Sequence, residues 1–159
     1  MKDTILMGMS ACGKTTLIQA LQGESPRYVK TQTVERHLHF IDTPGEYIER
    51  RYLYRALIVT AADAEVIGLV QDVGRESSWI PPAFATTFDK PVFGIVTKCD
   101  LARCQADVEH ARGALERAGA DPVFVVSALD RTGLDDLRAY LEMDRDAEQA
   151  DETDEAVAA

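Results

Sequence analysis

The sequence lacks several features that mark particular classes of protein. Only three of its 159 residues are cysteine, an odd number without metal-ligand spacing, which favours reduced thiols over a disulfide framework. No apolar run approaches the ~18 residues of a membrane-spanning helix, and the N-terminus has no cleavage site typical of a signal peptide. Lys and Arg number 17 against 27 Asp and Glu, so a nucleic-acid-binding surface is not expected.

The acidic excess is concentrated at the C-terminus. Residues 142–159 hold eight acidic residues and one Arg, which leaves a net charge of −3 for the rest of the chain. This segment is rich in Ala and lacks aromatic residues, which predicts a disordered, solubilising tail, with docking to a partner as the alternative. We expect one folded domain at residues 1–142 and an acidic tail at 143–159.

Apolar, β-branched runs alternate with longer stretches of helical character. The expected strands are residues 4–9, 37–42, 64–73, 91–97 and 121–128. The expected helices are residues 14–23, 47–63, 80–88, 103–120 and 133–143. Strands of this kind, separated by helices, are typical of a mostly parallel sheet covered on both faces. We predict a three-layer α/β domain with about five strands, whose ligands bind beyond the carboxyl ends of the strands.

The first expected strand runs into a glycine-rich segment, GMSACGKTT, at residues 8–16. It fits the pattern G-x-x-x-x-G-K-[ST] in full. The N–H groups of such a loop converge on phosphate oxygens, Lys14 would bridge the β- and γ-phosphates, and Thr15 would bind Mg²⁺. Lys14 is therefore also a candidate catalytic residue. The candidate phosphate-binding residues are Gly8, Ser10, Ala11, Cys12, Gly13, Lys14, Thr15 and Thr16.

A second polar cluster, IDTPGE, ends the next expected strand at residues 41–46. Asp42 can hold Mg²⁺ through water, and Gly45 offers a backbone N–H close to a γ-phosphate with no side chain to obstruct it. A switch loop would also need a threonine that closes on Mg²⁺ and the γ-phosphate. Thr31 and Thr33 both qualify by residue type.

The last two expected strands end in TKCD, residues 97–100, and SAL, residues 127–129. Asp100 presents acceptor oxygens that match the adjacent N1–H and 2-amino donors of guanine, whereas adenine would face the carboxylate with a lone pair. Such a mismatch costs ~1–3 kcal/mol or more. Lys98 would lay its stem over the base, and Ala128 would donate its N–H to the guanine O6.

The ordered motifs along residues 8–129 resemble those of the guanine-nucleotide-binding superfamily. That superfamily combines a phosphate loop, a switch threonine, D-x-x-G, [NT]-K-x-D and S-A-x in this order. The resemblance implies a P-loop NTPase fold, a Ras-like G domain, that binds GTP and GDP with Mg²⁺. It adds Thr97, Ser127 and Leu129 to the residues expected to bind the base.

A closer resemblance is carried by KTQTVE, residues 30–35, followed by IDTPGEY, residues 41–47. These segments are similar to the EutP and PduV family, small GTPase-like proteins of ethanolamine and propanediol utilisation linked to bacterial microcompartments. The resemblance covers about residues 1–142 and favours Thr31 as the switch threonine. It implies a cytosolic protein whose partner is a microcompartment shell or pathway protein. Some members are acetate-kinase-like, so slow GTP hydrolysis, phosphoryl transfer to acetate and non-catalytic docking stay open as alternatives.

One spacing and two residues depart from the superfamily pattern. Only eleven positions separate Thr31 from Asp42, so we expect one strand there instead of a hairpin. Thr97 stands where Asn is commonest, and its shorter side chain is expected to weaken the tie between the base loop and the phosphate loop. Glu46 replaces a water-orienting Gln and adds negative charge, so we expect slow hydrolysis. Glu46 is a candidate catalytic general base, with a plain surface carboxylate as the alternative.

Overall fold

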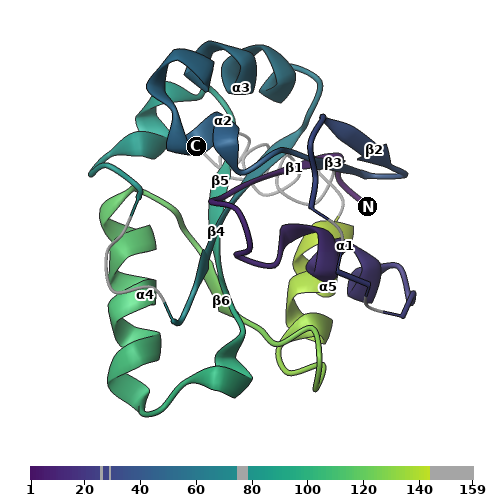
Figure 1. Ribbon diagram of the computed structural model, residues 1–159, viewed down its shortest axis with the longest axis vertical. Helices are drawn as coiled ribbons and strands as arrows, with labels where there is room; N and C mark the ends of the chain where they lie inside the picture. Colours follow the sequence, from purple (N-terminus) through teal and green to yellow (C-terminus); the bar gives the residue numbers. More distant parts are fainter. Residues whose placement is uncertain (26, 29, 75–78, 144–159) are drawn as a thin grey trace, which may run out of the picture.

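The computed structural model describes residues 1–143 except 26, 29 and 75–78. Apart from Met143, the tail predicted at residues 143–159 lies outside the described residues. Figure 1 shows the arrangement of the helices and strands along the chain. In chain order the elements are β1 (Thr4–Met7), α1 (Lys14–Leu21), β2 (Glu35–His37), β3 (Phe40–Asp42), α2 (Glu46–Glu49), η1 (Arg51–Leu53), α3 (Tyr54–Ala61), β4 (Val66–Asp72), η2 (Phe84–Thr87), β5 (Val92–Thr97), η3 (Cys99–Leu101), α4 (Gln105–Arg117), β6 (Val123–Val125) and α5 (Leu134–Glu142).

The strands form one sheet in the order β2-β3-β1-β4-β5-β6. Every neighbouring pair is parallel except β2 and β3. The central strands are buried on both faces, which is why their sequences read as continuous apolar runs. The predicted fold class, an α/β domain with a mostly parallel sheet, is confirmed.

Two layers of helices cover the two faces of the sheet. Because side chains alternate along a strand, Ile5 and Met7 of β1 pack in the core beneath α2, α3 and α4. Leu6, between them, packs in the opposite core beneath α1 and α5. Figure 1 shows α4 on one side of the sheet and α5 on the other. The three layers place the carboxyl ends of all five parallel strands at one edge.

The expectation of a single strand between Thr31 and Asp42 is wrong. The structure places β2 and β3 there as an antiparallel hairpin, in which Glu35 pairs with Asp42 and His37 with Phe40. The sheet therefore has six strands instead of about five. Strands of three residues and a two-residue turn are short enough to fit into the eleven positions.

Two expected helices are also shorter than their sequences suggested. The run 47–63 is divided into α2, η1 and α3, because Arg50 takes an extended conformation with φ −122° and ψ 114°. The run 80–88 holds only the 3₁₀ turn η2, because Ala83 takes a left-handed conformation with φ 59° and Phe88 is extended, which limits the turn to the residues between them.

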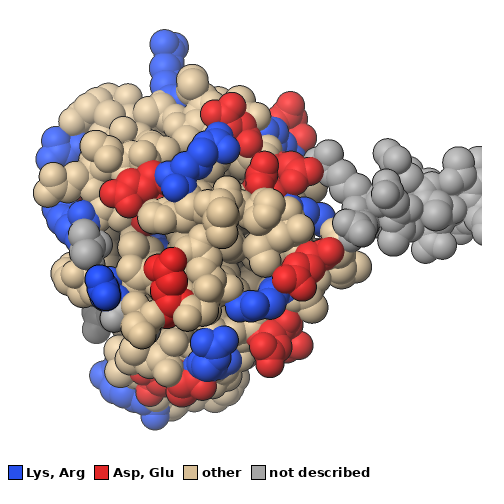
Figure 2. Space-filling view, turned by 90° about the vertical axis from the view of Figure 1, so that its right-hand side faces the viewer, with Lys and Arg blue, Asp and Glu red and all other residues tan. Residues whose placement is uncertain are grey.

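The surface carries both signs of charge. On the face that Figure 2 shows, basic and acidic side chains of the described residues are interspersed. None of the described helices combines the length and the apolar composition that a membrane crossing requires.

Candidate functional site

The polar segments that follow β1, β3, β5 and β6 meet at the carboxyl edge of the sheet. They line two cavities, one of about 200 Å³ beside the glycine-rich loop and one of about 360 Å³ beside Asp100. Gly13, Thr16 and Tyr28 line both cavities, so the two are adjacent. The structure thus brings residues as far apart in sequence as Ser10 and Leu129 into one continuous site.

The loop between β1 and α1 has the close backbone packing for which its glycines were singled out. Gly13 has a φ of 95°, a conformation that favours glycine, and α1 begins at the next residue. A Cβ at Gly8 would lie 2.6 Å from the Val70 carbonyl oxygen and 2.7 Å from Cys12 Sγ. Thr15 and Thr16 line the smaller cavity, so the N-terminus of α1, whose first N–H groups have no partner within the helix, faces it as anion binding requires.

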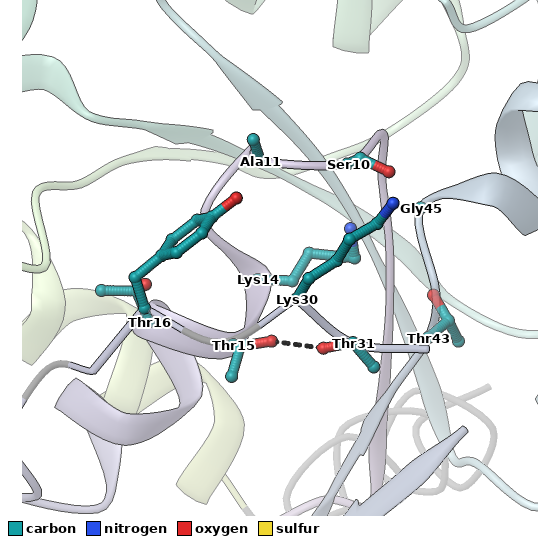
Figure 3. A pocket seen from close by; sticks show the side chains of 11 residues that line it. Ser10, Ala11, Lys14, Thr15, Thr16, Lys30, Thr31, Thr43 and Gly45 are labelled. Carbon is teal, nitrogen blue, oxygen red and sulfur yellow. Dashed lines mark hydrogen bonds between the residues drawn. The ribbon is translucent and has the colours of Figure 1, made fainter. Parts of the chain in front are cut away.

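Lys14 is buried inside this loop. Its Nζ donates hydrogen bonds to the carbonyl oxygens of Gly8, at 2.7 Å, and Met9, at 3.0 Å. These bonds, with a third to Cys12 Sγ at 3.6 Å, hold the charge at the base of the smaller cavity, where Figure 3 shows the side chain. A thiol sulfur is a weak acceptor, so an anion in the cavity can replace it as the partner of the third donor.

The three predicted metal-binding residues lie in contact with one another. Thr31 Oγ1 lies 2.8 Å from Thr15 Oγ1, as Figure 3 shows, and 2.9 Å from Asp42 Oδ2. The Thr15 hydroxyl also donates to Asp42 Oδ2. The first turn of α1, the end of β3 and the loop between α1 and β2 therefore converge, and this places Thr31 in the cluster.

The oxygen atoms of this cluster fit a magnesium ion. Asp42 Oδ1 is buried and is one of the side-chain atoms in the described part of the chain for which no hydrogen-bond partner is found. A buried carboxylate oxygen normally has a partner, and a cation or its bound water would supply one. One carboxylate, two hydroxyls and phosphate oxygens make the hard oxygen set that Mg²⁺ prefers. Within the described residues, no three His, Cys, Asp or Glu side chains gather as an alternative metal centre.

The turn after β3 is held against the glycine-rich loop. The Thr43 hydroxyl donates to the Leu6 carbonyl at 2.7 Å, which anchors the turn to β1. A Cβ at Gly45 would lie 2.1 Å from Ser10 N, so no larger residue fits there without movement. Close by, Ser10 N–H donates to Glu49 Oε1 at 2.9 Å, so one N–H of the loop is bound to a carboxylate of α2.

Glu46, the first residue of α2, forms an ion pair with Lys30. Glu46 Oε1 lies 2.9 Å from Lys30 Nζ. The hydrogen bond from Lys30 lowers the pKa of the Glu46 carboxyl from its ordinary value. A lower pKa makes a carboxylate a weaker proton acceptor, so this arrangement does not favour the general-base hypothesis.

The larger cavity is lined by the residues predicted to bind a base. Ser127 Oγ donates to Asp100 Oδ1 at 2.7 Å and so fixes the orientation of the carboxylate. Lys98 Nζ donates to the Ala11 carbonyl oxygen at 2.5 Å, which ties the base loop to the phosphate loop. Ala128 and Leu129 line the cavity beside Asp100, whereas Ser127 is buried behind it. Carboxylate oxygens keep free lone pairs after one such bond, so Asp100 can still accept from a ligand.

The expectation that Thr97 would leave the two loops weakly joined does not match the geometry. Thr97 is buried, and its hydroxyl donates to the Cys12 carbonyl oxygen at 2.5 Å. The backbones approach closely enough for a hydroxyl to make this bond without the length of an amide side chain. Cys12 itself is buried, and burial raises the pKa of its thiol, which does not favour a nucleophilic role.

Sequence reasoning missed several residues that line the cavities. Tyr28 lines both cavities, Lys30 and Thr43 line the smaller one, and Leu101 and Val126 line the larger one. Tyr28 is the one aromatic residue in the polar stretch 22–38, which is a signal that could have identified it. Leu101 and Val126 flank the TKCD and SAL motifs and carry no signal of their own.

A parallel sheet with a phosphate loop between β1 and α1, and a second cavity at the ends of β5 and β6, defines a P-loop NTPase fold of the Ras-like G-domain type. Within that class, the chain belongs to the PduV-EutP family, described as "Ethanolamine utilisation - propanediol utilisation", whose model matches residues 1–143. The resemblance drawn from KTQTVE and IDTPGEY is therefore confirmed.

Individual relatives agree with this family. The chain is 43% identical over 143 residues to propanediol utilization protein PduV of Citrobacter freundii, covering 89% of this chain and 93% of that protein. It is 33% identical over 144 residues to probable acetate kinase EutP of Escherichia coli (strain K12), covering 89% of both.

More distant similarity extends to GTPases and translation factors. The chain is 30% identical over 156 residues to GTPase Era of Afipia carboxidovorans, covering 86% of this chain and 51% of that protein. It superposes on bacterial selenocysteine-specific elongation factor EF-Sec with a TM-score of 0.63 and 21% identity, covering 86% of this chain and 27% of that chain. The latter likeness bears on the fold alone.

Proposed function

We propose that this protein is a Mg²⁺-dependent guanine-nucleotide-binding protein with slow intrinsic GTP hydrolysis that acts in ethanolamine or propanediol utilisation. The observation that carries the proposal is the position of Asp100 in a cavity that shares Gly13, Thr16 and Tyr28 with the phosphate cavity. A nucleotide with its phosphates on the loop would therefore extend its base towards a carboxylate. That carboxylate selects guanine over adenine.

In this proposal the phosphate chain lies on the N-terminus of α1. The N–H groups of the loop bind the phosphate oxygens, and so does Lys14, by exchanging its weak bond to Cys12 Sγ for one to phosphate. Thr15, Thr31 and Asp42 hold Mg²⁺, which neutralises phosphate charge when it is bound. Thr31 comes from the loop before β2, so its contact with this cluster links that loop to the state of the nucleotide.

The slow rate follows from the residue after Gly45. Glu46 is ionised and acceptor-only, so it lacks the donor with which a Gln orients an attacking water. A carboxylate near the terminal phosphate also opposes the charge that develops there. We therefore expect turnover to need a partner, and we propose a cytoplasmic location with a microcompartment shell or pathway protein as that partner.

The base assignment is tested by exchanging the carboxylate for an amide. Asp100→Asn turns one acceptor into a donor, which opposes the 2-amino group of guanine and matches the 2-oxo group of xanthine. Titration calorimetry is expected to show GDP affinity falling about 100-fold or more and XDP binding gained. Asp89→Asn, at an exposed position away from both cavities, serves as the control. Unchanged GDP affinity in Asp100→Asn contradicts the assignment.

A second candidate activity rests on the relatives described as probable acetate kinases at 33% identity. In that reaction a carboxylate oxygen of acetate attacks the γ-phosphorus, and the bond to the β–γ bridging oxygen breaks to give acetyl phosphate and a nucleoside diphosphate. Trapping acetyl phosphate with hydroxylamine distinguishes the activities. Hydrolysis gives free phosphate without hydroxamate, transfer gives hydroxamate, and turnover equal to that of Lys14→Ala in both assays indicates a non-catalytic docking module.

A further inference from the structure

Two lysines reach the phosphate cavity from different parts of the chain. Of the described residues that line it, Lys14 and Lys30 are the cationic ones. Lys14 begins α1, whereas Lys30 immediately precedes Thr31, the switch threonine of the metal cluster. Figure 3 shows the Lys30 side chain running across the cavity towards Gly45.

The two ammonium groups are held differently. Lys14 is buried and bonded to two carbonyl oxygens of its own loop. The Lys30 side chain is 57% exposed and pairs with a single carboxylate, that of Glu46, which is 31% exposed. An ion pair so open to solvent contributes little, so it can be exchanged for a stronger anion.

A terminal phosphate is such an anion, and it would lie close to this pair. The Gly45 backbone lies against Ser10 of the phosphate loop, and Glu46 is the next residue along the chain. Phosphate oxygens carry more charge than a carboxylate and form short, charge-assisted hydrogen bonds with ammonium groups. A cation at the rim of the cavity, on the Gly45 side, is placed to meet the last phosphate of a chain whose earlier phosphates lie over Lys14 and α1.

We propose that Lys30 is a specificity-determining residue that recognises the γ-phosphate, and that it exchanges the Glu46 carboxylate for γ-phosphate oxygens when a triphosphate binds. The inference rests on the proposed nucleotide-binding function and deepens it. Glu46 then acts as a competitor that holds Lys30 while only a diphosphate is present. Thr31 is the next residue in the same loop, so the exchange at Lys30 also couples the terminal phosphate to the metal cluster.

The test compares affinities for GDP and for a non-hydrolysable GTP analogue, guanosine 5′-[β,γ-imido]triphosphate, in the presence of Mg²⁺. Lys30→Ala is expected to weaken the analogue about 10-fold or more and to leave GDP within about twofold, because the lost contact is to the γ-phosphate alone. Lys30→Arg is expected to restore most of the affinity. Lys2→Ala, which removes a lysine packed over Tyr140 on another part of the surface, is the matched control.

The competition is tested by Glu46→Gln alone and in combination. Glu46→Gln is expected to strengthen analogue binding a few-fold when Lys30 is present and to have a smaller effect in the Lys30→Ala background, where only the direct repulsion of the phosphate is removed; a double-mutant cycle measures this coupling. Equal losses for GDP and the analogue in Lys30→Ala, or no loss for either, overturn the proposal. A wild-type protein that fails to prefer guanine overturns the proposed function instead, so the two failures are distinguishable.

Discussion

The bond between Thr97 and the phosphate loop gives a prediction that isolates one interaction. Thr97 is 4% exposed, and its hydroxyl donates to the Cys12 carbonyl oxygen at 2.5 Å across 85 positions of sequence. Thr97→Val keeps the shape of the side chain and replaces the hydroxyl with a methyl group. The substitution leaves a buried carbonyl oxygen without its partner.

The expected cost follows from that unpaired oxygen. A buried acceptor that loses its donor costs about 1–3 kcal/mol, so the free energy of unfolding is expected to fall by about 2 kcal/mol. For a chain of this length, about 2 kcal/mol corresponds to a decrease of roughly 4–8 °C in the melting temperature. GDP affinity is expected to fall about 3- to 10-fold as well, because the base loop is no longer tied to the phosphate loop.

Thermal unfolding followed by circular dichroism measures the first effect, and titration calorimetry measures the second. Thr33→Val is the matched control, because Thr33 is exposed in the loop before β2. A Thr97→Val protein that melts within about 1 °C of the wild type and binds GDP equally well would show that this hydrogen bond is not needed. The hydroxyl would then contribute nothing net to either loop.

Three further predictions concern contacts elsewhere in the described structure. Lys90 Nζ donates to three carbonyl oxygens at the C-terminal end of α3 and the turn after it. Lys90→Met is therefore expected to lower the free energy of unfolding, measured by urea denaturation, by about 1–3 kcal/mol. An unchanged midpoint would contradict this. Glu49→Gln removes a negative charge that is bonded to the Ser10 N–H of the phosphate loop, where it opposes the charge of a phosphate. GDP affinity measured by calorimetry is therefore expected to rise about 2- to 5-fold. A decrease would show that the carboxylate supports the loop. Burial raises the pKa of the Cys12 thiol, which keeps the reactive thiolate scarce at neutral pH. Mass spectrometry after brief iodoacetamide treatment is therefore expected to find the exposed Cys104 labelled before the buried Cys12. The reverse order would contradict the packing of Cys12.

The sequence predicted the elements whose signals are local and strong. The strands β1 and β5 appear where apolar runs predicted them, and the helices α1 and α4 appear where stretches of helical character predicted them. The motifs at their ends also come together as predicted, because parallel strands place their carboxyl ends at one edge.

The hairpin at residues 35–42 was missed because its turn has no turn signal. Leu38 occupies a position with φ 49°, where glycine or asparagine is usual, and its side chain is exposed. Beside Phe40, an apolar Leu38 looks like part of one alternating strand. The end of α2 at Arg50 was missed for the same reason, since neither proline nor glycine marks it in the sequence.

The site could be predicted by residue type but not by its contacts. Nothing in the sequence gives the pairing of Lys30 with Glu46, because that contact depends on how the loop before β2 lies against α2. The reach of the Thr97 hydroxyl also depends on a backbone approach between β5 and the phosphate loop, which residue type alone does not determine.

The central claim is that the cavity beside Asp100 selects guanine. The most direct measurement is the affinity of the unmodified protein for GDP and for ADP in the same Mg²⁺-containing buffer, by titration calorimetry. We expect GDP to bind about 100-fold or more tightly than ADP, because adenine leaves the carboxylate without donors. Equal affinities for the two nucleotides would show that the cavity beside Asp100 does not select guanine.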